Sequence, residues 1–181
     1  MEPIHKLFDE RINGGVPGWY QDMVPHMQHL RDYARTCDHC TEFGVRTGQS
    51  SVALTAGMTD RGGGRLVSYD ICERVFDLPL NQNVAWEYVV ADTFHLPDIA
   101  ETDLLFIDTV HNSSQVAQEL THAHRVKKYI LFHDVIAWGS RGENGEGINH
   151  AIFSFLARNP DWIIHNFFKS EWGLLAIKRI Q

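Results

Sequence analysis

Segments with the pattern of β-strands alternate with segments that have the pattern of α-helices from Cys40 to the C-terminus. The clearest strand is residues 103–108, where a continuous apolar run lies between two aspartates, as is typical of a strand buried on both faces. Alternating strands and helices predict a mostly parallel sheet with right-handed crossovers and helices on both of its faces. The sequence therefore predicts a doubly wound α/β fold.

Seven strands are expected, and the last two differ from the rest. Only four residues, 169–172, separate strands 162–168 and 173–179, and this spacing favours an antiparallel hairpin at the end of the sheet. The remaining strands are expected at 41–45, 65–70, 86–91, 103–108 and 129–133, with helices at 50–58, at 113–125 and from Ile148 to the Asn159-Pro160 pair.

The N-terminal part has a different pattern. Residues 12–18 separate an N-terminal arm from the rest of the chain. Apolar residues at helical spacing then predict an amphipathic helix over about 19–36. We interpret residues 1–39 as a cap, in which Trp19 and Tyr20 are candidates to cover a ligand, and residues 40–181 as the domain that holds the site. The apolar residues of that helix are Met23, Met27, Leu30 and Ala34.

Length and charge limit the classes of partner. The 181 residues suit one domain, and a net charge of −7, from 23 acidic and 16 basic residues, argues against a broad nucleic-acid surface. No apolar run approaches the roughly 20 residues that a membrane helix needs. The first residues lack the order of a signal peptide, so a cytoplasmic location without membrane contact is expected.

Cys37 and Cys40 have the CxxC spacing of some zinc and redox sites. A structural zinc site needs a second pair of ligands, and none is visible in the sequence. We therefore interpret them as two small, partly buried thiols at a helix-to-strand junction.

Three carboxylates fall at the ends of successive predicted strands, where ligands bind in doubly wound sheets. Glu42 precedes a turn containing Gly44 and Gly48, and it can either orient the turn amides or engage an ammonium group. Asp70 ends the second strand and suits ribose hydroxyls. Asp92 ends the third strand and suits an adenine amino group. We expect these groups to converge on one nucleoside.

The turn also constrains the type of nucleoside. Position 46 is Arg46 rather than glycine, which argues against a pyrophosphate-binding loop. A nucleoside without pyrophosphate, such as S-adenosylmethionine, is therefore favoured over a nicotinamide dinucleotide. The candidate cofactor-binding residues are Glu42, Gly44, Gly48, Ser50, Asp70, Asp92 and Thr93.

Four segments carry a resemblance to a known family: residues 42–48, 103–111, 129–134 and 172–177. Over about residues 40–179 the chain resembles class I S-adenosylmethionine-dependent methyltransferases. It is similar to the group that contains the metal-dependent sugar O-methyltransferases and the cephalosporin-hydroxylase-like proteins. The resemblance implies the class I fold and S-adenosylmethionine as cofactor.

The resemblance also implies a divalent metal, usually Mg²⁺, held by Asp108, His133 and Asp134. His133 departs from the family pattern, and an imidazole suits Mn²⁺, Fe²⁺ or Zn²⁺ better than Mg²⁺. Either the metal differs or His133 has another role. By the same resemblance His111, three residues after Asp108, is the general base, and its ordinary pKa near neutrality suits that task.

These patterns predict methyl transfer to a hydroxyl of a small molecule, a sugar or natural product, with metal assistance. Asp108 and His111 are the candidate catalytic residues, and in so short a chain a homodimer is a candidate to complete the pocket. Two alternatives stay open. One is a non-catalytic nucleoside-binding domain of the same fold. The other is a nicotinamide-dependent oxidoreductase, against which Arg46 and the final hairpin argue.

Overall fold

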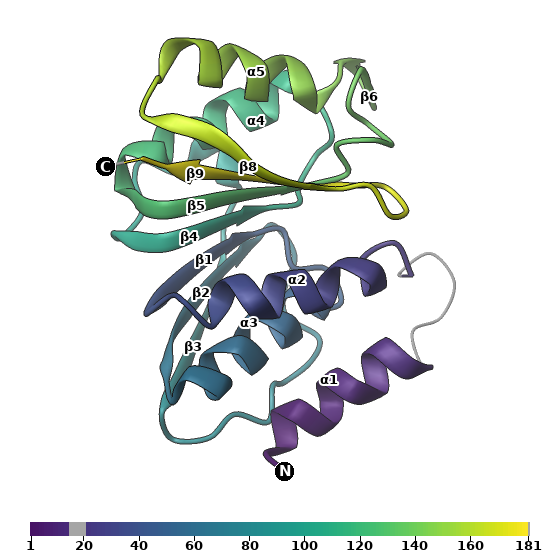
Figure 1. Ribbon diagram of the computed structural model, residues 1–181, viewed down its shortest axis with the longest axis vertical. Coiled ribbons are helices and arrows are strands. Elements are labelled where there is room, and N and C mark those ends of the chain that lie inside the picture. Colours follow the sequence, from purple (N-terminus) through teal and green to yellow (C-terminus); the bar gives the residue numbers. More distant parts are fainter. Residues whose placement is uncertain (15–20, 181) are drawn as a thin grey trace.

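The computed structural model describes residues 1–14 and 21–180. Their main feature is a seven-stranded sheet with the order β3-β2-β1-β4-β5-β9-β8 (Figure 1). Neighbouring strands from β3 to β5 are parallel, whereas β9 is antiparallel to both β5 and β8. The predicted doubly wound sheet with a C-terminal antiparallel hairpin is confirmed. The strands are β1 (His39–Phe43), β2 (Gly64–Asp70), β3 (Val84–Val90), β4 (Thr102–Ile107), β5 (Val126–His133), β8 (Trp162–Phe168) and β9 (Leu174–Arg179).

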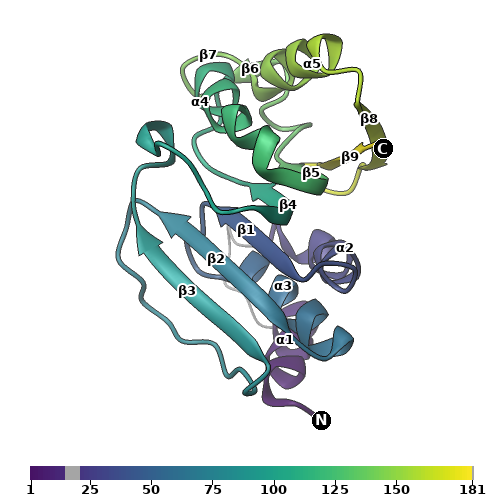
Figure 2. The same ribbon diagram turned by 90° about the vertical axis from the view of Figure 1, so that its left-hand side faces the viewer.

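Helices cover both faces of the sheet (Figure 2). In β4 the side chains of Leu104 and Phe106 join the core under α2 and α3, and those of Leu105 and Ile107 join the core under α4 and α5. All four are buried, which explains why this strand is apolar at successive positions. The α-helices are α1 (Pro3–Asn13), α2 (Val24–Ala34), α3 (Gln49–Arg61), α4 (Ser113–Glu119) and α5 (Ile148–Arg158), with short 3-10 helices η2 (Thr93–His95) and η3 (Leu120–Arg125).

The N-terminal arm contains a helix, α1, that was not predicted from the sequence. Its residues Ile4 and Phe8 are buried in the same core as α2 and α3. Apolar residues at positions 4, 7, 8 and 12, together with Pro3 at the first turn, are the signal for this helix. The helix expected over about 19–36 is α2. Trp19 and Tyr20, the candidate cover, lie outside the described residues.

Two connections differ from the expected pattern of plain loops and crossover helices. The segment 139–147, for which no strand was predicted, contains a two-stranded hairpin of β6 (Arg141–Gly142) and β7 (Gly145–Glu146). The connection between β2 and β3 has no helix in residues 71–83. There Phe76 stacks on Trp86 and lies against the turn at Gly48.

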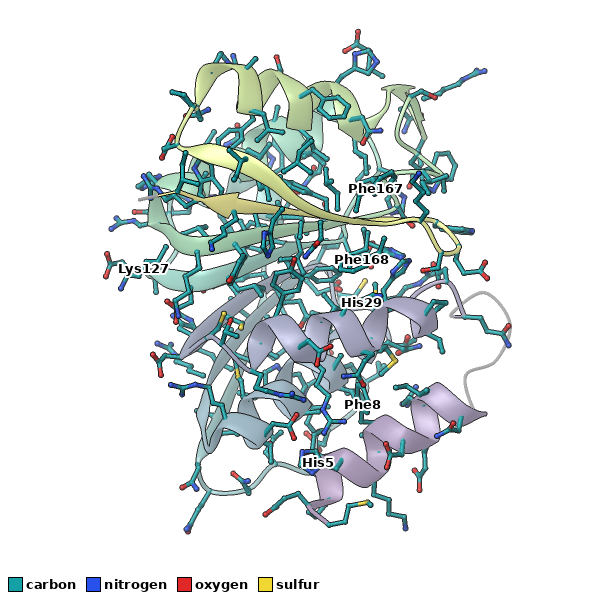
Figure 3. The ribbon with its side chains drawn as sticks, in the orientation of Figure 1. His5, Phe8, His29, Lys127, Phe167 and Phe168 are labelled. Carbon is teal, nitrogen blue, oxygen red and sulfur yellow. The ribbon has the colours of Figure 1, made fainter. Side chains whose placement is uncertain are left out.

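Helix α2 is also tied to the terminal hairpin. The ring of His29 stacks on that of Phe168 in β8, with 3.7 Å between the ring centroids (Figure 3). Tyr33, one turn further along α2, accepts a hydrogen bond of 2.7 Å from the side chain of Asn166 in β8. Helix α2 is therefore packed against strand β8 of the terminal hairpin.

Cys37 and Cys40 are free thiols, and both are completely buried where α2 leads into β1. Within residues 1–14 and 21–180, neither belongs to a group of three side chains able to hold a metal ion. Both thiols are more deeply buried than the partly buried thiols expected from the sequence. In the same residues no helix has the length and apolarity that crossing a membrane requires.

Gly44 follows β1 at the tightest point of the fold. Its amide donates to the carbonyl of Tyr69 at 2.9 Å, and the amide of Asp108 donates to the carbonyl of Phe43 at 2.9 Å. The φ angle of Gly44 is +82°, and a Cβ at this position would lie 1.9 Å from the carbonyl oxygen of Asp108. Only glycine fits here, because the clash is with backbone that cannot move aside.

Gly44→Ala is expected to lower the free energy of unfolding by more than about 2 kcal/mol, because it adds a backbone clash to a strained φ angle. Gly62→Ala is the matched control. Gly62 also has a positive φ, +99°, but nothing lies within 4 Å of a Cβ there, so a loss of about 1 kcal/mol is expected. Urea denaturation measures both variants. Equal losses would contradict the role assigned to Gly44.

Candidate active site

A pocket of about 400 Å³ opens at the C-terminal edge of the sheet, beside β1 and β4, where the strand order reverses. This is the place at which doubly wound sheets bind ligands, and the volume is typical of sites for small organic molecules. We call it the strand-end pocket. Its walls include Gly44, Asp70, Ile71, Asp92, Phe94 and Asp108.

Asp70 fastens the turn after β1 to the end of β2. Its Oδ2 accepts hydrogen bonds from the amides of Val45 and Arg46 at 2.8 and 2.9 Å, and its Oδ1 accepts one from Cys72 at 2.8 Å. Arg46 has a φ of +53°, so it adopts the left-handed conformation in which glycine is common. Asp70 therefore shapes the pocket floor and also lines it.

Asp92 and Thr93 line the opposite wall of the strand-end pocket. Asp92 caps η2 by accepting a hydrogen bond from the amide of Phe94 at 2.9 Å. Thr93 is buried and donates to Glu119 of α4 at 2.6 Å. Glu119 was not predicted, although it also accepts hydrogen bonds from Thr109 and Gln115. Nothing in the sequence separates it from a surface glutamate of a helix.

Glu42 does not line the strand-end pocket with Asp70 and Asp92. It is completely buried beneath the turn, and its Oε2 accepts hydrogen bonds from Ser51 at 2.7 Å and Ser68 at 2.5 Å. Burial raises the pKa of Glu42 to about 7, against the opposing effect of the serine hydrogen bonds. The expected convergence of three carboxylates is therefore seen for two of them, and Glu42 supports the turn from below.

Gly48 and Ser50 lie at the start of α3, outside the strand-end pocket. Gly48 has a φ of +79°, and a Cβ there would lie 2.2 Å from the ring of Phe76. Ser50 is buried and lines a small cavity of about 30 Å³ together with Asp22 and Asp108. Ser50 thus borders the site at its α3 side, whereas Gly48 lines none of these pockets.

A second pocket, of about 290 Å³, adjoins the first. We call it the acidic pocket, because four carboxylates line it with one histidine. It shares Gly44, Val45, Arg46, Asp108, Thr109 and Glu143 with the strand-end pocket, so the two are continuous. Its remaining residues are Asp22, His111, Asp134 and Trp172.

His111 is held between carboxylates. Its Nε2 lies 2.6 Å from Oδ2 of Asp134 and 3.7 Å from Oδ1 of Asp108, and its Nδ1 lies 2.5 Å from Oε1 of Glu143. The ring also stacks on Trp138, with 5.6 Å between centroids and 5° between planes. Both ring nitrogens and one ring face are therefore fixed in place.

The predicted metal residues also lie together. Nδ1 of His133 is 3.4 Å from Oδ1 of Asp108 and 3.1 Å from Oδ1 of Asp134. His133 and Asp134 are each only 2% exposed. Asp134 has a φ of +64°, an uncommon conformation for a residue other than glycine, and such strain is concentrated at functional sites.

Oppositely charged neighbours set the direction in which the pKa values of His111, His133 and Asp108 are shifted. Burial lowers the pKa of His111 and of His133, but Asp108 and Asp134 outweigh it and raise each pKa to about 10. Burial raises the pKa of Asp108, but His133 and His111 outweigh it and lower that pKa below its usual value. In the protein without a cation, both imidazoles are therefore held protonated at neutral pH.

Asp22, His26 and Glu143 were not predicted. Asp22 comes from the segment before α2, and burial raises its pKa. His26 of α2 is fully buried with its ring edge-on to His133, 5.3 Å between centroids, and burial lowers its pKa to about 4. Glu143 comes from the β6–β7 hairpin. Asp22 and His26 come long before residues 108–134 in the chain, and Glu143 comes after them. No local sequence pattern therefore indicates that they lie near Asp108, His133 and Asp134.

Comparison with known proteins identifies the family. A family model described as a methyltransferase domain matches residues 41–135, which is more than half of the chain. The chain belongs to this methyltransferase family. The matched residues of this methyltransferase run from β1 to just beyond β5, and so they include Asp70, Asp92, Asp108 and His111.

Solved structures agree on the fold. The chain is similar to a methyltransferase of Podospora anserina, solved with S-adenosylhomocysteine (16% identity, 100% of this chain and 89% of that chain, TM-score 0.60). It is also similar to the O-methyltransferase TomG of Streptomyces achromogenes, solved with S-adenosylmethionine (17%, 99% and 87%, 0.62). A third is the O-methyltransferase of Bacillus cereus, solved with S-adenosylhomocysteine (16%, 97% and 88%, 0.61). No curated protein sequence matches the chain.

Glu42→Gln is expected to flatten the pH dependence of stability. The folded-state pKa of about 7 lies above the value of about 4.3 for an unfolded glutamate. Its contribution to stability is therefore complete below about pH 4.3 and is lost as the pH rises through 7. Urea denaturation at several pH values should show the wild type losing up to roughly 3 kcal/mol more than Glu42→Gln over this range.

Glu10→Gln is the control for this measurement, because Glu10 is an exposed glutamate that pairs only with Lys6 among the described residues. It should follow the wild-type pH profile. Parallel profiles for the wild type and Glu42→Gln would show that Glu42 is ionised in the folded protein at acid pH, against the argument from burial.

Proposed function

We propose that this methyltransferase transfers the methyl group of S-adenosylmethionine to a hydroxyl group of a small molecule, such as a sugar or natural product. One observation carries the proposal: the strand-end pocket and the acidic pocket are continuous through six shared residues. A donor in the first pocket would thus meet an acceptor in the second beside Asp108 and His111. Methyl transfer is an in-line displacement, which gains most of its rate from such positioning.

The donor is assigned to the strand-end pocket by its chemistry. Asp70 and Asp92 present carboxylates that suit ribose hydroxyls and an adenine amino group, as predicted from the sequence. Ile71 and Phe94, which are exposed apolar side chains of the same pocket, offer surfaces for a purine ring. The structures of TomG and of the Bacillus cereus and Podospora anserina enzymes, which hold S-adenosylmethionine or S-adenosylhomocysteine, support S-adenosylmethionine as the donor.

His111 is assigned the proton of the acceptor hydroxyl. It lies in the acidic pocket at the boundary with the donor, and its carboxylate partners orient it. With its pKa raised to about 10, however, it holds its own proton at neutral pH. It can receive the proton of the acceptor only after it has lost its own to solvent, and this requires positive charge that offsets Asp108 and Asp134, because those two carboxylates raise its pKa.

A divalent cation fits this requirement and the residues present. Nε2 of His133 is buried without a hydrogen-bond partner, and Nδ1 of His133 and Oδ1 of Asp134 contact each other at 3.1 Å but make no hydrogen bond, which is costly unless another group binds them. Asp108, His133 and Asp134 would hold the cation, and an imidazole in the set favours Mn²⁺ over Mg²⁺. When bound, the cation would polarise the acceptor hydroxyl. The residues themselves orient the acceptor and receive its proton.

One observation favours a second candidate, a nucleoside-binding domain without catalysis. Both ring nitrogens of His111 contact carboxylates, Nε2 that of Asp134 and Nδ1 that of Glu143. Donor binding without turnover on any hydroxylated acceptor, with Mg²⁺ or Mn²⁺ present, would support this candidate.

Asp70→Ala is expected to weaken the binding of S-adenosylmethionine and S-adenosylhomocysteine by about 10- to 100-fold, since it releases the turn and removes a charged acceptor. Asp77→Ala is the control, because Asp77 is an exposed aspartate of the neighbouring segment that pairs with Arg74. Isothermal titration calorimetry measures both, with NAD as a ligand that should not bind. Unchanged affinity in Asp70→Ala would argue against the donor assignment.

Asp134→Asn is expected to leave donor affinity unchanged and to reduce methyl transfer by about 10²- to 10⁴-fold, because it removes the partner of His111 and His133. Asparagine tolerates the left-handed backbone of this position. Transfer of labelled methyl to a panel of sugars and phenols, with Mg²⁺ or Mn²⁺, measures the effect. Wild-type turnover in the variant would rule out the assigned role of this carboxylate.

A further inference from the structure

Asp22 lies against the buried end of the acidic pocket, although it comes from the segment before α2 and lies outside the residues that the family model matches. A carboxylate oxygen of Asp22, a ring nitrogen of His133 and a carboxylate oxygen of Asp134 all lie within 4.8 Å of one another. Ligands on one divalent cation at about 2.1 Å have similar mutual separations. The three groups come from two distant parts of the chain.

The buried atoms of this trio have incomplete hydrogen bonding in the protein. His133 and Asp134 are each only 2% exposed; Nε2 of His133 has no hydrogen-bond partner, and Nδ1 of His133 lies 3.1 Å from Oδ1 of Asp134 without forming a hydrogen bond. Oδ1 of Asp22 accepts a hydrogen bond of 3.0 Å from the amide of Met23, which fixes the direction of the carboxylate. Unpartnered buried polar atoms that face a fixed carboxylate point to a bound group.

The charges around Asp22 indicate the kind of group that would bind there. Asp22, Asp108 and Asp134 line the same pocket. Three carboxylates thus lie together and repel one another, with the imidazoles of His111 and His133 as partial compensation. A divalent cation would offset this repulsion, whereas an anion or a neutral ligand would leave it in place.

We infer that Asp22 is a ligand of a divalent transition-metal cation that His133 and Asp134 also bind. The inference deepens the proposed function, since it rests on a cation in the acidic pocket. Two carboxylates and one imidazole form a mixed oxygen and nitrogen set, which suits Mn²⁺, Fe²⁺ or Co²⁺ better than Mg²⁺. Such a cation would also join the start of α2 to the ends of β4 and β5.

The test uses the full-length protein after removal of metals with a chelator. Mn²⁺ is titrated and the free ion is measured by electron paramagnetic resonance, so that no catalytic activity is needed. Wild type should bind Mn²⁺ with one equivalent at the site. Asp22→Asn should lower the affinity at least tenfold. Co²⁺ should give visible absorption bands with wild type that are weakened or lost in the same variant.

Glu146→Gln is the matched control, because it removes the same negative charge from the β6–β7 hairpin but lies outside the trio and outside the lining of both pockets. It should keep its Mn²⁺ affinity within about twofold of wild type. Thermal unfolding in chelator should show that Asp22→Asn folds as well as wild type, and addition of Mn²⁺ should stabilise wild type more than the variant.

Three results would overturn the inference. The first two are absence of Mn²⁺ binding by wild type and equal affinity in wild type and Asp22→Asn. The third is an equal loss in Asp22→Asn and Glu146→Gln, because it would show a general effect of charge. Calorimetry with S-adenosylhomocysteine on the same samples separates this inference from the proposed function. Failure of donor binding would remove the methyltransferase proposal, and failure of Mn²⁺ binding alone would remove only the cation site.

Discussion

The backbone around Gly44 is the constraint on which the rest of the site depends. Hydrogen bonds to the ends of β2 and β4 hold this residue so closely that no side chain fits. Asp70 then fixes the two following amides, so the turn cannot relax away from the sheet. As a result the ends of three strands stay within reach of one ligand, and the residues after β4 face the same opening.

The acidic pocket shows the energetic cost of such an arrangement. Carboxylates at positions 22, 108 and 134 and imidazoles at 111 and 133 are brought together with little solvent. Removing charges from water is expensive unless each finds a partner, and here the pairs are incomplete, because His133 and Asp134 retain unpartnered atoms. Proteins retain such clusters where function requires them, and strongly shifted pKa values are characteristic of functional sites.

The sequence predicted the sheet and part of the pocket lining, and the reasons are physical. The apolar run of β4 reports burial on both faces, and acids at strand ends report the edge where ligands bind. The direction of Glu42 was not predictable in the same way, because the residue lies within β1 and its side chain points beneath the turn to Ser51 and Ser68. Asp22 and Glu143 reach the site only through tertiary packing. Helix α1 was not predicted, although its apolar residues at positions 4, 8 and 12 have helical spacing.

The connection between β2 and β3 has a consequence for how ligands enter and leave. Residues 71–83 form no helix, and they contact β3 through the ring of Phe76 on Trp86 and through the hydroxyl of Tyr88 on the carbonyl of Cys72. Displacing this segment would break those contacts but would melt no turn of regular structure, so we expect a smaller barrier than for unravelling a crossover helix. If the strand-end pocket holds the donor as proposed, exchange of spent for fresh cofactor would proceed at this side, where Ile71 lines the pocket, while the sheet stays intact.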